Sequence, residues 1–204
     1  MNWSDAVGSW NEEGILQISV CQCLRIGEAW EDLRMLTSCW VLYHNDRPGA
    51  WIIHDDAQIE MLPDRIYLLA PGTAFRTKTA ARPHQLYIHF NFSMPGRTFR
   101  PGLISIPCTR DVSELVVELR RDIQPRTVRP PMTVVVRAVA LCALVLRHWP
   151  PDKVRQGRWD PRIADVLANM RSIFRMPLPL SYWADQAGLA VAPFIRLFRK
   201  HTGM

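Results

Sequence analysis

The chain has 204 residues, of which 48% are hydrophobic and 22% charged, and its net charge at pH 7 is +6. This length permits one large domain or two small ones with a real hydrophobic core, and the composition excludes general disorder. The basic excess lies at one end: residues 150–204 hold nine basic and four acidic side chains, against 16 and 15 before them. A nucleic-acid-binding module could use this charge, although a solvated arginine-rich surface would give the same balance.

The N-terminus and the cysteines indicate the compartment. Residues 1–5 have neither a basic segment nor an apolar run, so no signal peptide is expected. Residues 138–146 are apolar, but these nine residues make only about half a membrane span. Five cysteines without a C-x-x-C pair favour buried reduced thiols over a disulfide framework or a structural zinc site. We expect a cytoplasmic protein without a membrane partner.

Residues 14–106 are expected to form many short strands. Segments rich in β-branched and aromatic residues are Ile15–Val20, Trp40–Tyr43, Trp51–Ile53, Ile66–Leu69 and Leu86–Phe90. The turn-forming sequences between and after them are Asn45–Gly49, Pro63-Asp64, Pro71-Gly72 and Pro95-Gly96. This spacing predicts an antiparallel sandwich or barrel rather than βαβ units.

After Pro107 the hydrophobic period becomes helical. One helix is marked by Val112, Leu115, Val116 and Leu119. A second is expected from about Met132 to Trp149, with Arg137 interrupting its apolar run. Its apolar residues at helical spacing are Val135, Val139, Cys142, Val145 and Leu146. This helix either covers the barrel or pairs with its copy in a homodimer.

The last part of the chain has a different pattern. Residues 150–159 are polar and aperiodic, so we expect a linker there. A helix follows, with Asp160 as its cap and Pro161 in its first turn. Residues 180–203 then fit a helix-turn-helix, because Ala184 allows another helix to approach and Gly188 sits at a tight turn. Its second helix would face inward with Phe194, Leu197 and Phe198, and outward with Arg196, Arg199 and Lys200.

The residues Gly188-Leu189, Arg196–Lys200 and Thr202-Gly203 resemble the first helix-turn-helix of the AraC/XylS-type transcription regulators, without a gap over residues 180–203. The helix expected at Arg162–Phe174 is similar to the opening helix of that family's DNA-binding domain. Upstream segments similar to the family's sensor barrels are Arg47–Trp51, Tyr67–Thr73 and Leu86–Phe90.

This resemblance implies an α+β fold: an N-terminal cupin-like antiparallel β-barrel, a helical connector and a C-terminal helix-turn-helix domain. The implied domains are residues 1–149 for effector binding and dimerisation, 150–159 as linker and 160–204 as the first helix-turn-helix subdomain. A homodimer that binds DNA and a small-molecule effector is implied as well. Such a protein would regulate transcription.

The sequence departs from the family pattern at the caps of two helices, in the first turn of the recognition helix and after the first helix-turn-helix. Ala190 replaces the serine that usually caps the recognition helix, at a cost of about 1 kcal/mol. Pro179 stands at the cap of the preceding helix, and Pro193 falls in the first turn, where a missing N–H is tolerated. Family members carry a second helix-turn-helix, whereas this sequence ends at Met204. We therefore expect a truncated domain that binds DNA with a dissociation constant of about 10⁻⁴–10⁻⁶ M.

The candidate DNA-binding residues are Ala192, Ile195, Arg196, Arg199 and Lys200. Arg196 can donate to the two acceptors of a guanine, whereas Ala192 and Ile195 offer apolar contact to thymine methyl groups. Arg199 and Lys200 would hold phosphates, which positions the helix without reading the sequence.

The candidate ligand-binding residues of the barrel are Trp40, Tyr43, Trp51, His54, Tyr87 and His89. Aromatic faces stack on the apolar faces of sugars, while His and Tyr side chains bond to hydroxyl groups. A sugar or similar polar metabolite therefore suits these residues, although the aromatic side chains could equally well just fill the barrel.

A cupin-type enzyme, or a cupin that binds a small molecule without regulating transcription, is the alternative. A metal-binding cupin needs a His-x-His pair with a nearby Glu and another His after its Pro-Gly turn. This sequence lacks His-x-His and has Phe75 after Pro71-Gly72, while the barrel's histidines are scattered. G-x-S-x-G and phosphate-loop motifs are also missing. We predict a sensor without catalytic residues, metal or cofactor.

Overall fold

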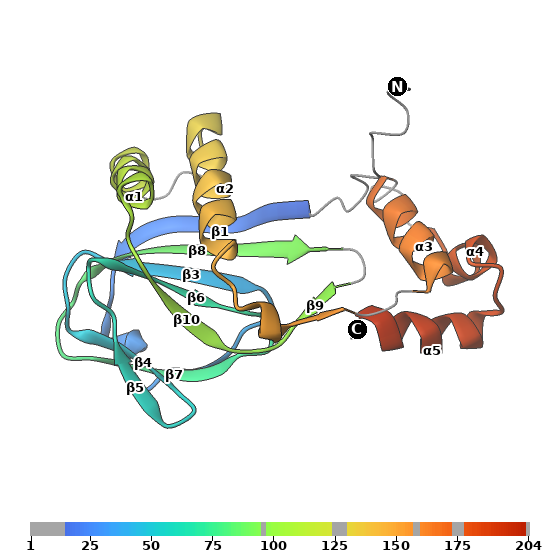
Figure 1. Cartoon of the computed structure of the whole chain (residues 1–204), viewed down its shortest axis with the longest axis horizontal. Coiled ribbons are helices and arrows are strands. Elements are labelled where there is room, and N and C mark those ends of the chain that lie inside the picture. Colours follow the sequence, from blue (N-terminus) through green and yellow to red (C-terminus); the bar gives the residue numbers. More distant parts are fainter. Residues whose placement is uncertain (1–14, 95–96, 124–129, 157–159, 173–177, 203–204) are drawn as a thin grey trace, which may run out of the picture. The chain divides into compact units, whose positions relative to one another are not determined.

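The computed structural model describes residues 15–94, 97–123, 130–156, 160–172 and 178–202 (Figure 1). They divide into two compact units. One, called the β unit here, holds residues 15–93 and 99–154; the other, called the helical unit, holds the described parts of 94–98 and 155–202.

The strands come mainly from the first half of the chain. They are β1 (Ile15–Arg25), β2 (Arg34–Leu36), β3 (Trp40–Asn45), β4 (Ala50–His54), β5 (Ala57–Glu60), β6 (Arg65–Leu69), β7 (Ala74–Thr79), β8 (His84–Ser93), β9 (Arg97–Phe99), β10 (Leu103–Pro107) and β11 (Val154–Gln156). Short 3-10 helices are η2 (Glu28–Trp30) and η3 (Pro151–Lys153).

Two antiparallel sheets form the β unit. One has the strand order β1-β8-β3-β6-β10, the other β2-β7-β4-β5, and β9 pairs with β11 separately. Tyr43 lies directly opposite Tyr87 in the first sheet, and Trp51 lies opposite Lys78 in the second. The antiparallel strands predicted from the sequence are confirmed. The closed barrel is not, because no ladder joins the two sheets among the described residues.

The five-stranded sheet is covered on both faces. Against the four-stranded sheet it buries Val41, Tyr43, Tyr67 and Leu69, which meet Ile52 and Phe75 in a sheet–sheet core. Its other face buries Trp40, Leu42, Ile88 and Phe90 under two helices, in a sheet–helix core. All six residues of β3 are therefore buried, and side-chain alternation directs neighbouring residues to opposite faces of the sheet.

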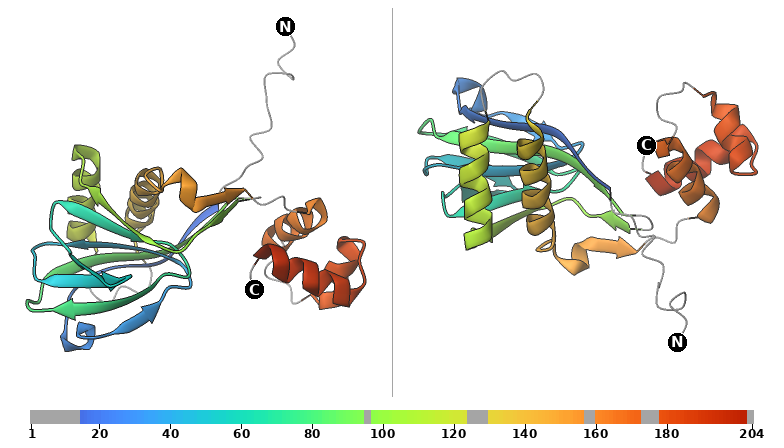
Figure 2. Two further views of the ribbon diagram at one scale, coloured as in Figure 1. Left: turned by 60° about the horizontal axis from the view of Figure 1, so that its bottom comes forward. Right: turned by 90° about the horizontal axis from the view of Figure 1, so that it is seen from above.

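The covering helices are α1 (Arg110–Asp122) and α2 (Met132–Leu146), which lie side by side over the sheet in Figures 1 and 2. Arg137, the charge in the apolar run of α2, joins them through Glu118, 2.8 Å away, and Asp122. Cys142 and Val145 are fully buried in the sheet–helix core. Two of the five α2 residues expected to pair with a second copy are therefore covered by the protein's own sheet, whereas Val135, Val139 and Leu146 are half-buried.

The helical unit holds α3 (Pro161–Ser172), α4 (Leu180–Gln186) and α5 (Val191–Thr202). They enclose a small core that includes Ile163, Val166, Trp183, Ala184 and Phe194. The predicted helix at residue 161 begins as expected, with Asp160 Oδ1 accepting from the Arg162 backbone N–H at 3.1 Å. Part of the expected linker is ordered, because residues 151–156 form η3 and β11; residues 157–159 lie outside the described residues.

The turn between α4 and α5 follows from Gly188. Its φ is +61°, a left-handed conformation that glycine adopts without a Cβ penalty. Its N–H donates to the Asp185 carbonyl, and the Leu189 N–H donates to the Ala184 carbonyl, both at 2.9 Å. This pair of bonds is a Schellman motif, which ends α4 and reverses the chain into α5.

Candidate functional site

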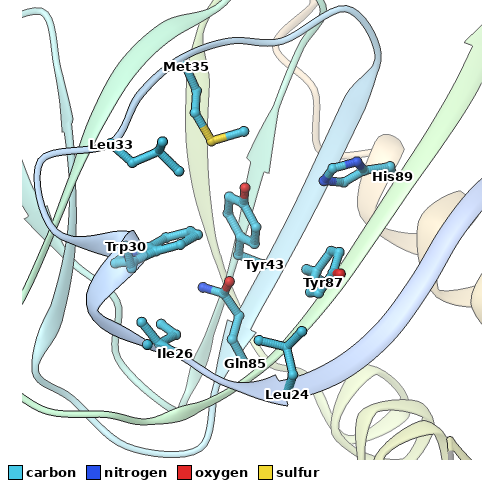
Figure 3. A pocket seen from close by; sticks show the side chains of 10 residues that line it. Leu24, Ile26, Trp30, Leu33, Met35, Tyr43, Gln85, Tyr87 and His89 are labelled. Atoms are coloured by element: carbon cyan, nitrogen blue, oxygen red, sulfur yellow. The ribbon is translucent and has the colours of Figure 1, made fainter. Parts of the chain in front are cut away.

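A cavity of about 270 Å³ lies beside the sheet–sheet core (Figure 3). Its walls come from β1, η2, β2, β3 and β8 and the loops next to them. The lining residues are Leu24, Ile26, Gly27, Trp30, Leu33, Met35, Tyr43, Gln85, Tyr87 and His89. The volume is near the lower end of the range for small-molecule pockets.

Alternation along two paired strands supplies the polar groups of this pocket. Gln85, Tyr87 and His89 follow at every second position of β8, so they share a face, and Tyr43 of β3 pairs with Tyr87. Gln85 Nε2 donates a hydrogen bond to Asn45 Oδ1 at 3.1 Å, and the Tyr87 hydroxyl donates to Gln22 Oε1 at 2.6 Å.

Two polar groups of the pocket are unpaired. Neither the Tyr43 hydroxyl nor the His89 ring forms a side-chain hydrogen bond with any described residue. Burial raises the pKa of Tyr43, and burial lowers the pKa of His89. Both side chains are therefore uncharged at neutral pH, and each can exchange hydrogen bonds with a ligand.

The rest of the lining is apolar. Leu24, Ile26, Leu33 and Met35 are aliphatic, and Trp30 packs edge-on against Tyr43 with ring centroids 5.4 Å apart. None of the ten lining residues is an acid, a lysine or an arginine. A charged ligand would lose its hydration here without gaining an ionic partner, so the pocket suits an uncharged and mostly apolar molecule.

The structure brings together three of the six candidate ligand residues: Tyr43, Tyr87 and His89. Trp40 is fully buried in the sheet–helix core, where it stacks with Phe90 and meets Trp149 edge-on at 4.8 Å. Because Trp40 and Tyr43 are an odd number of positions apart on one strand, they face opposite sides of the sheet.

Trp51 and His54 also lie outside the pocket lining. Trp51 alternates with the buried Ile52, and Lys78 approaches its ring at 5.9 Å. His54 bonds through Nδ1 to the Ala74 carbonyl at 2.9 Å. Trp30, Met35 and Gln85 were not among the residues expected at the pocket. Alternation from Tyr87 could have found Gln85, whereas Trp30 lies in the short 3-10 helix η2 and Met35 in the three-residue strand β2.

The histidines do not converge. His44 contacts α1, and His84 lies 3.5 Å from Asp46. Phe75, at the position where a metal-binding cupin would have another histidine, packs in the sheet–sheet core near Tyr43. Within the residues that the structure describes, no group of three or more His, Cys, Asp or Glu side chains could hold a metal ion. All five cysteines are free thiols.

In the helical unit, α5 presents a basic surface. Phe194, Leu197 and Phe198 pack inward, whereas Arg196, Arg199 and Lys200 are exposed. These three cations form no ion pair with a described residue. In the β unit, by contrast, exposed arginines such as Arg47, Arg82 and Arg110 each have a carboxylate partner. Ala192 is also exposed, and Ile195 is half-buried.

No family model and no curated protein matches the sequence. Solved structures similar to the chain include ToxT from Vibrio cholerae, at 11% identity over 92% of this chain and 96% of ToxT, with a TM-score of 0.40. ToxT with an unsaturated fatty acid bound has 8% identity over 94% of this chain and 92% of that one, with a TM-score of 0.37. The AraC-like transcriptional activator CuxR has 11% identity over 94% and 71%, with a TM-score of 0.38.

In the described part of the chain, no helix is both long and apolar enough to cross a membrane.

Proposed function

We propose that this protein is a DNA-binding transcription regulator of the AraC/XylS type that senses a small molecule with its β unit. The observation that carries the proposal is the exposed, unpaired cluster of Arg196, Arg199 and Lys200 on α5. This helix follows a Schellman turn at Gly188, and a short turn that contains glycine is common between the two helices of a helix-turn-helix. An unpaired cationic helix surface is suited to a polyanion.

The contacts to DNA would divide along α5. Ala192, Ile195 and Arg196 would reach base edges, with Arg196 bonding to a guanine. Arg199 and Lys200 would bind phosphates. Pro193 supports this arrangement, because it lies in the first turn of α5, where no helical hydrogen bond needs its N–H.

The ligand would occupy the cavity beside Tyr43. We propose an uncharged, mostly apolar molecule with one or two polar groups, which Tyr43 and His89 would bond. The lining favours such a ligand over the carbohydrate expected from the aromatic content, because a sugar needs partners for many hydroxyl groups.

A homodimer remains part of the proposal. Since Cys142 and Val145 are buried, its contact would use the exposed apolar side chains Val117, Met132 and Val136 on α1 and α2. A dimer would raise the affinity for paired DNA sites through effective concentration. Light scattering of the protein and of Val136→Glu tests it: we expect a dimer that the substitution dissociates, and a wild-type monomer at high micromolar concentration would contradict it.

DNA binding is tested by fluorescence anisotropy with a labelled duplex over a range of salt concentrations. Replacing Arg196, Arg199 and Lys200 together by Gln should weaken binding at 0.1 M salt by about two orders of magnitude. The matched control replaces Arg47, Arg82 and Arg110 by Gln, which removes the same charge from the β unit. Equal binding by both triple variants would contradict the proposal.

Ligand binding is tested with Nile red, an uncharged apolar dye whose fluorescence rises in apolar sites. We expect saturable binding of the dye. Tyr43→Phe should change the affinity for the dye without altering thermal stability, because the Tyr43 hydroxyl has no hydrogen-bond partner among the described residues. Binding unaffected both by Tyr43→Phe and by filling the cavity would contradict the assignment of the pocket.

A further inference from the structure

We propose that a groove between α3 and α5 binds a backbone phosphate of DNA, with Arg162 as the residue that holds it. This inference rests on the proposed DNA-binding function and adds a contact outside the expected recognition helix. It assigns a role in DNA binding to Arg162, at the start of α3.

The groove has a volume of about 310 Å³ and combines a basic rim with an apolar floor. Arg162 at the start of α3 and Arg196 and Lys200 of α5 supply three cations. Leu189, Pro193 and Leu197 supply the apolar part. No acidic residue lines the groove, but Asp160 beside it is paired with Arg162. An anion that enters the groove therefore meets the charges of Arg196 and Lys200, together with a guanidinium whose charge Asp160 partly offsets.

Arg162 is held in a fixed orientation. Its Nε and Nη2 donate to the two carboxylate oxygens of Asp160 at 2.9 and 2.7 Å. Asp160 also accepts from the Arg162 backbone N–H, so the carboxylate caps α3 and aligns the guanidinium at once. The hydrogen bond from Arg162 lowers the pKa of Asp160 to about 2, so this arrangement is present at every physiological pH.

A phosphodiester fits this setting. The Nη1 group and the second Nη2 hydrogen of Arg162 stay available, and guanidinium groups bind phosphate oxygens with two parallel hydrogen bonds. The apolar floor can contact the sugar that precedes or follows the phosphate. Arg196 and Lys200 belong both to the groove and to the exposed side of α5, so a DNA strand along α5 would pass over the groove.

A small phosphate anion is the other source of the same chemistry. It would use the three cations but not the apolar floor, and it would not connect the groove to α5's exposed side. The continuity of the two surfaces therefore favours DNA.

The test compares Arg162→Gln with Arg155→Gln in the full chain. Arg155 is an exposed arginine of the same unit that does not line the groove. Each phosphate contact adds about 0.9 to the slope of log K against log salt, so Arg162→Gln should reduce this slope by about one and weaken binding about eightfold at 0.1 M salt. The loss should be equal for all DNA sequences, and Arg155→Gln should leave the slope unchanged.

Two further measurements make the outcome decisive. Arg162→Lys should restore most of the slope, because it keeps the charge, and helix content by circular dichroism should match among the variants. Pyrophosphate is titrated as the small-anion probe. If the wild type binds DNA but Arg162→Gln keeps its slope, the inference is overturned, and Arg162-dependent binding of pyrophosphate would then identify a small-anion site. If the wild type does not bind DNA at all, the proposed function fails first.

Discussion

Arg120 of α1 donates from Nη2 to the backbone oxygen of His44 at 2.8 Å and to the Nδ1 atom of the same residue at 2.9 Å. It also reaches the His84 carbonyl at 3.1 Å. On the opposite side of the ring, Nε2 lies 2.9 Å from the Pro63 carbonyl and donates to it, so Nδ1 is the acceptor. Arg120 thus joins α1 to β3 through the backbone oxygen and the neutral ring of His44, and to β8 through the His84 carbonyl.

This arrangement predicts a loss of stability in mild acid. Burial, and secondarily the charge of Arg120, lower the pKa of His44 from 6.5 to about 4. Between these two pH values the unfolded chain binds more protons at His44 than the folded chain does. The contribution of neutral His44 to the free energy of unfolding is therefore fully present above pH 6.5. It falls by about 3 kcal/mol as the pH drops to 4.

Urea denaturation of wild type and His44→Gln between pH 7.5 and 4 measures the effect. Glutamine can keep one donor and one acceptor but does not titrate, so its curve should be flatter by about that amount. Parallel curves for the two proteins would exclude His44 as the source.

A second prediction concerns the turn at Gly49. Its φ is +102°, and a Cβ atom there would stand 2.6 Å from the Cβ of Ala81. The Gly49 carbonyl accepts from the N–H groups of Ala80 and Ala81, so the two segments cannot move apart at this contact without breaking these hydrogen bonds. Gly49→Ala should lower the free energy of unfolding by about 2–4 kcal/mol.

Gly27→Ala is the matched control for Gly49, because its φ is −101° and nothing lies within 4 Å of an added Cβ. It should change stability by less than about 0.5 kcal/mol in the same urea titration. Equal effects of the two substitutions would show that Gly49 is not constrained.

The sequence predicted the strands with strong β-forming composition, and the structure contains all of them. It did not name β2, β5, β7, β9, β10 or β11. For β2 and β7 the reason is that Arg34–Leu36 and Ala74–Thr79 include several polar or charged side chains on an exposed face. Whether the sheets close into a barrel depends on hydrogen bonds between edge strands. Neither composition nor periodicity contains that information.

The candidate pocket was only partly predictable for a different reason. Strand β3 is buried at every position because helices cover one face of its sheet and a second sheet covers the other. A continuous apolar run does not indicate which face a residue takes. Alternation does show that Trp40 and Tyr43 cannot share a pocket, but only the position of α2 decides which of them faces the helices.

The pocket leads to a third prediction. Leu33 lines the cavity and has 39% of its surface exposed, so a larger side chain there can fill the cavity without entering a closed core. Leu33→Trp should weaken Nile red binding about tenfold or more, because it occupies the space the dye needs. Fluorescence titration measures the affinity.

Leu62→Trp is the control for that experiment, since Leu62 is 37% exposed and does not line the cavity. Its affinity for the dye should stay within about twofold of the wild type. A loss of affinity in both variants would indicate a general effect of the added indole, and no loss in either would place the dye elsewhere.

The last prediction separates base reading from phosphate binding on α5. Duplexes that the wild-type protein selects from a random pool define its preferred site. Arg196→Ala should weaken binding to this site by about 1–3 kcal/mol and relax the preference at one base pair, because a bidentate contact to guanine is lost. Arg199→Ala should instead weaken binding equally for all duplexes and lower the salt slope by about one, since a phosphate contact has no sequence information.

Both side chains are exposed and unpaired in the protein, so neither substitution should change its thermal stability. Selection with each variant, followed by anisotropy at several salt concentrations, distinguishes the two roles. A preference retained in full by Arg196→Ala but relaxed by Arg199→Ala would reverse the assignment of the two arginines.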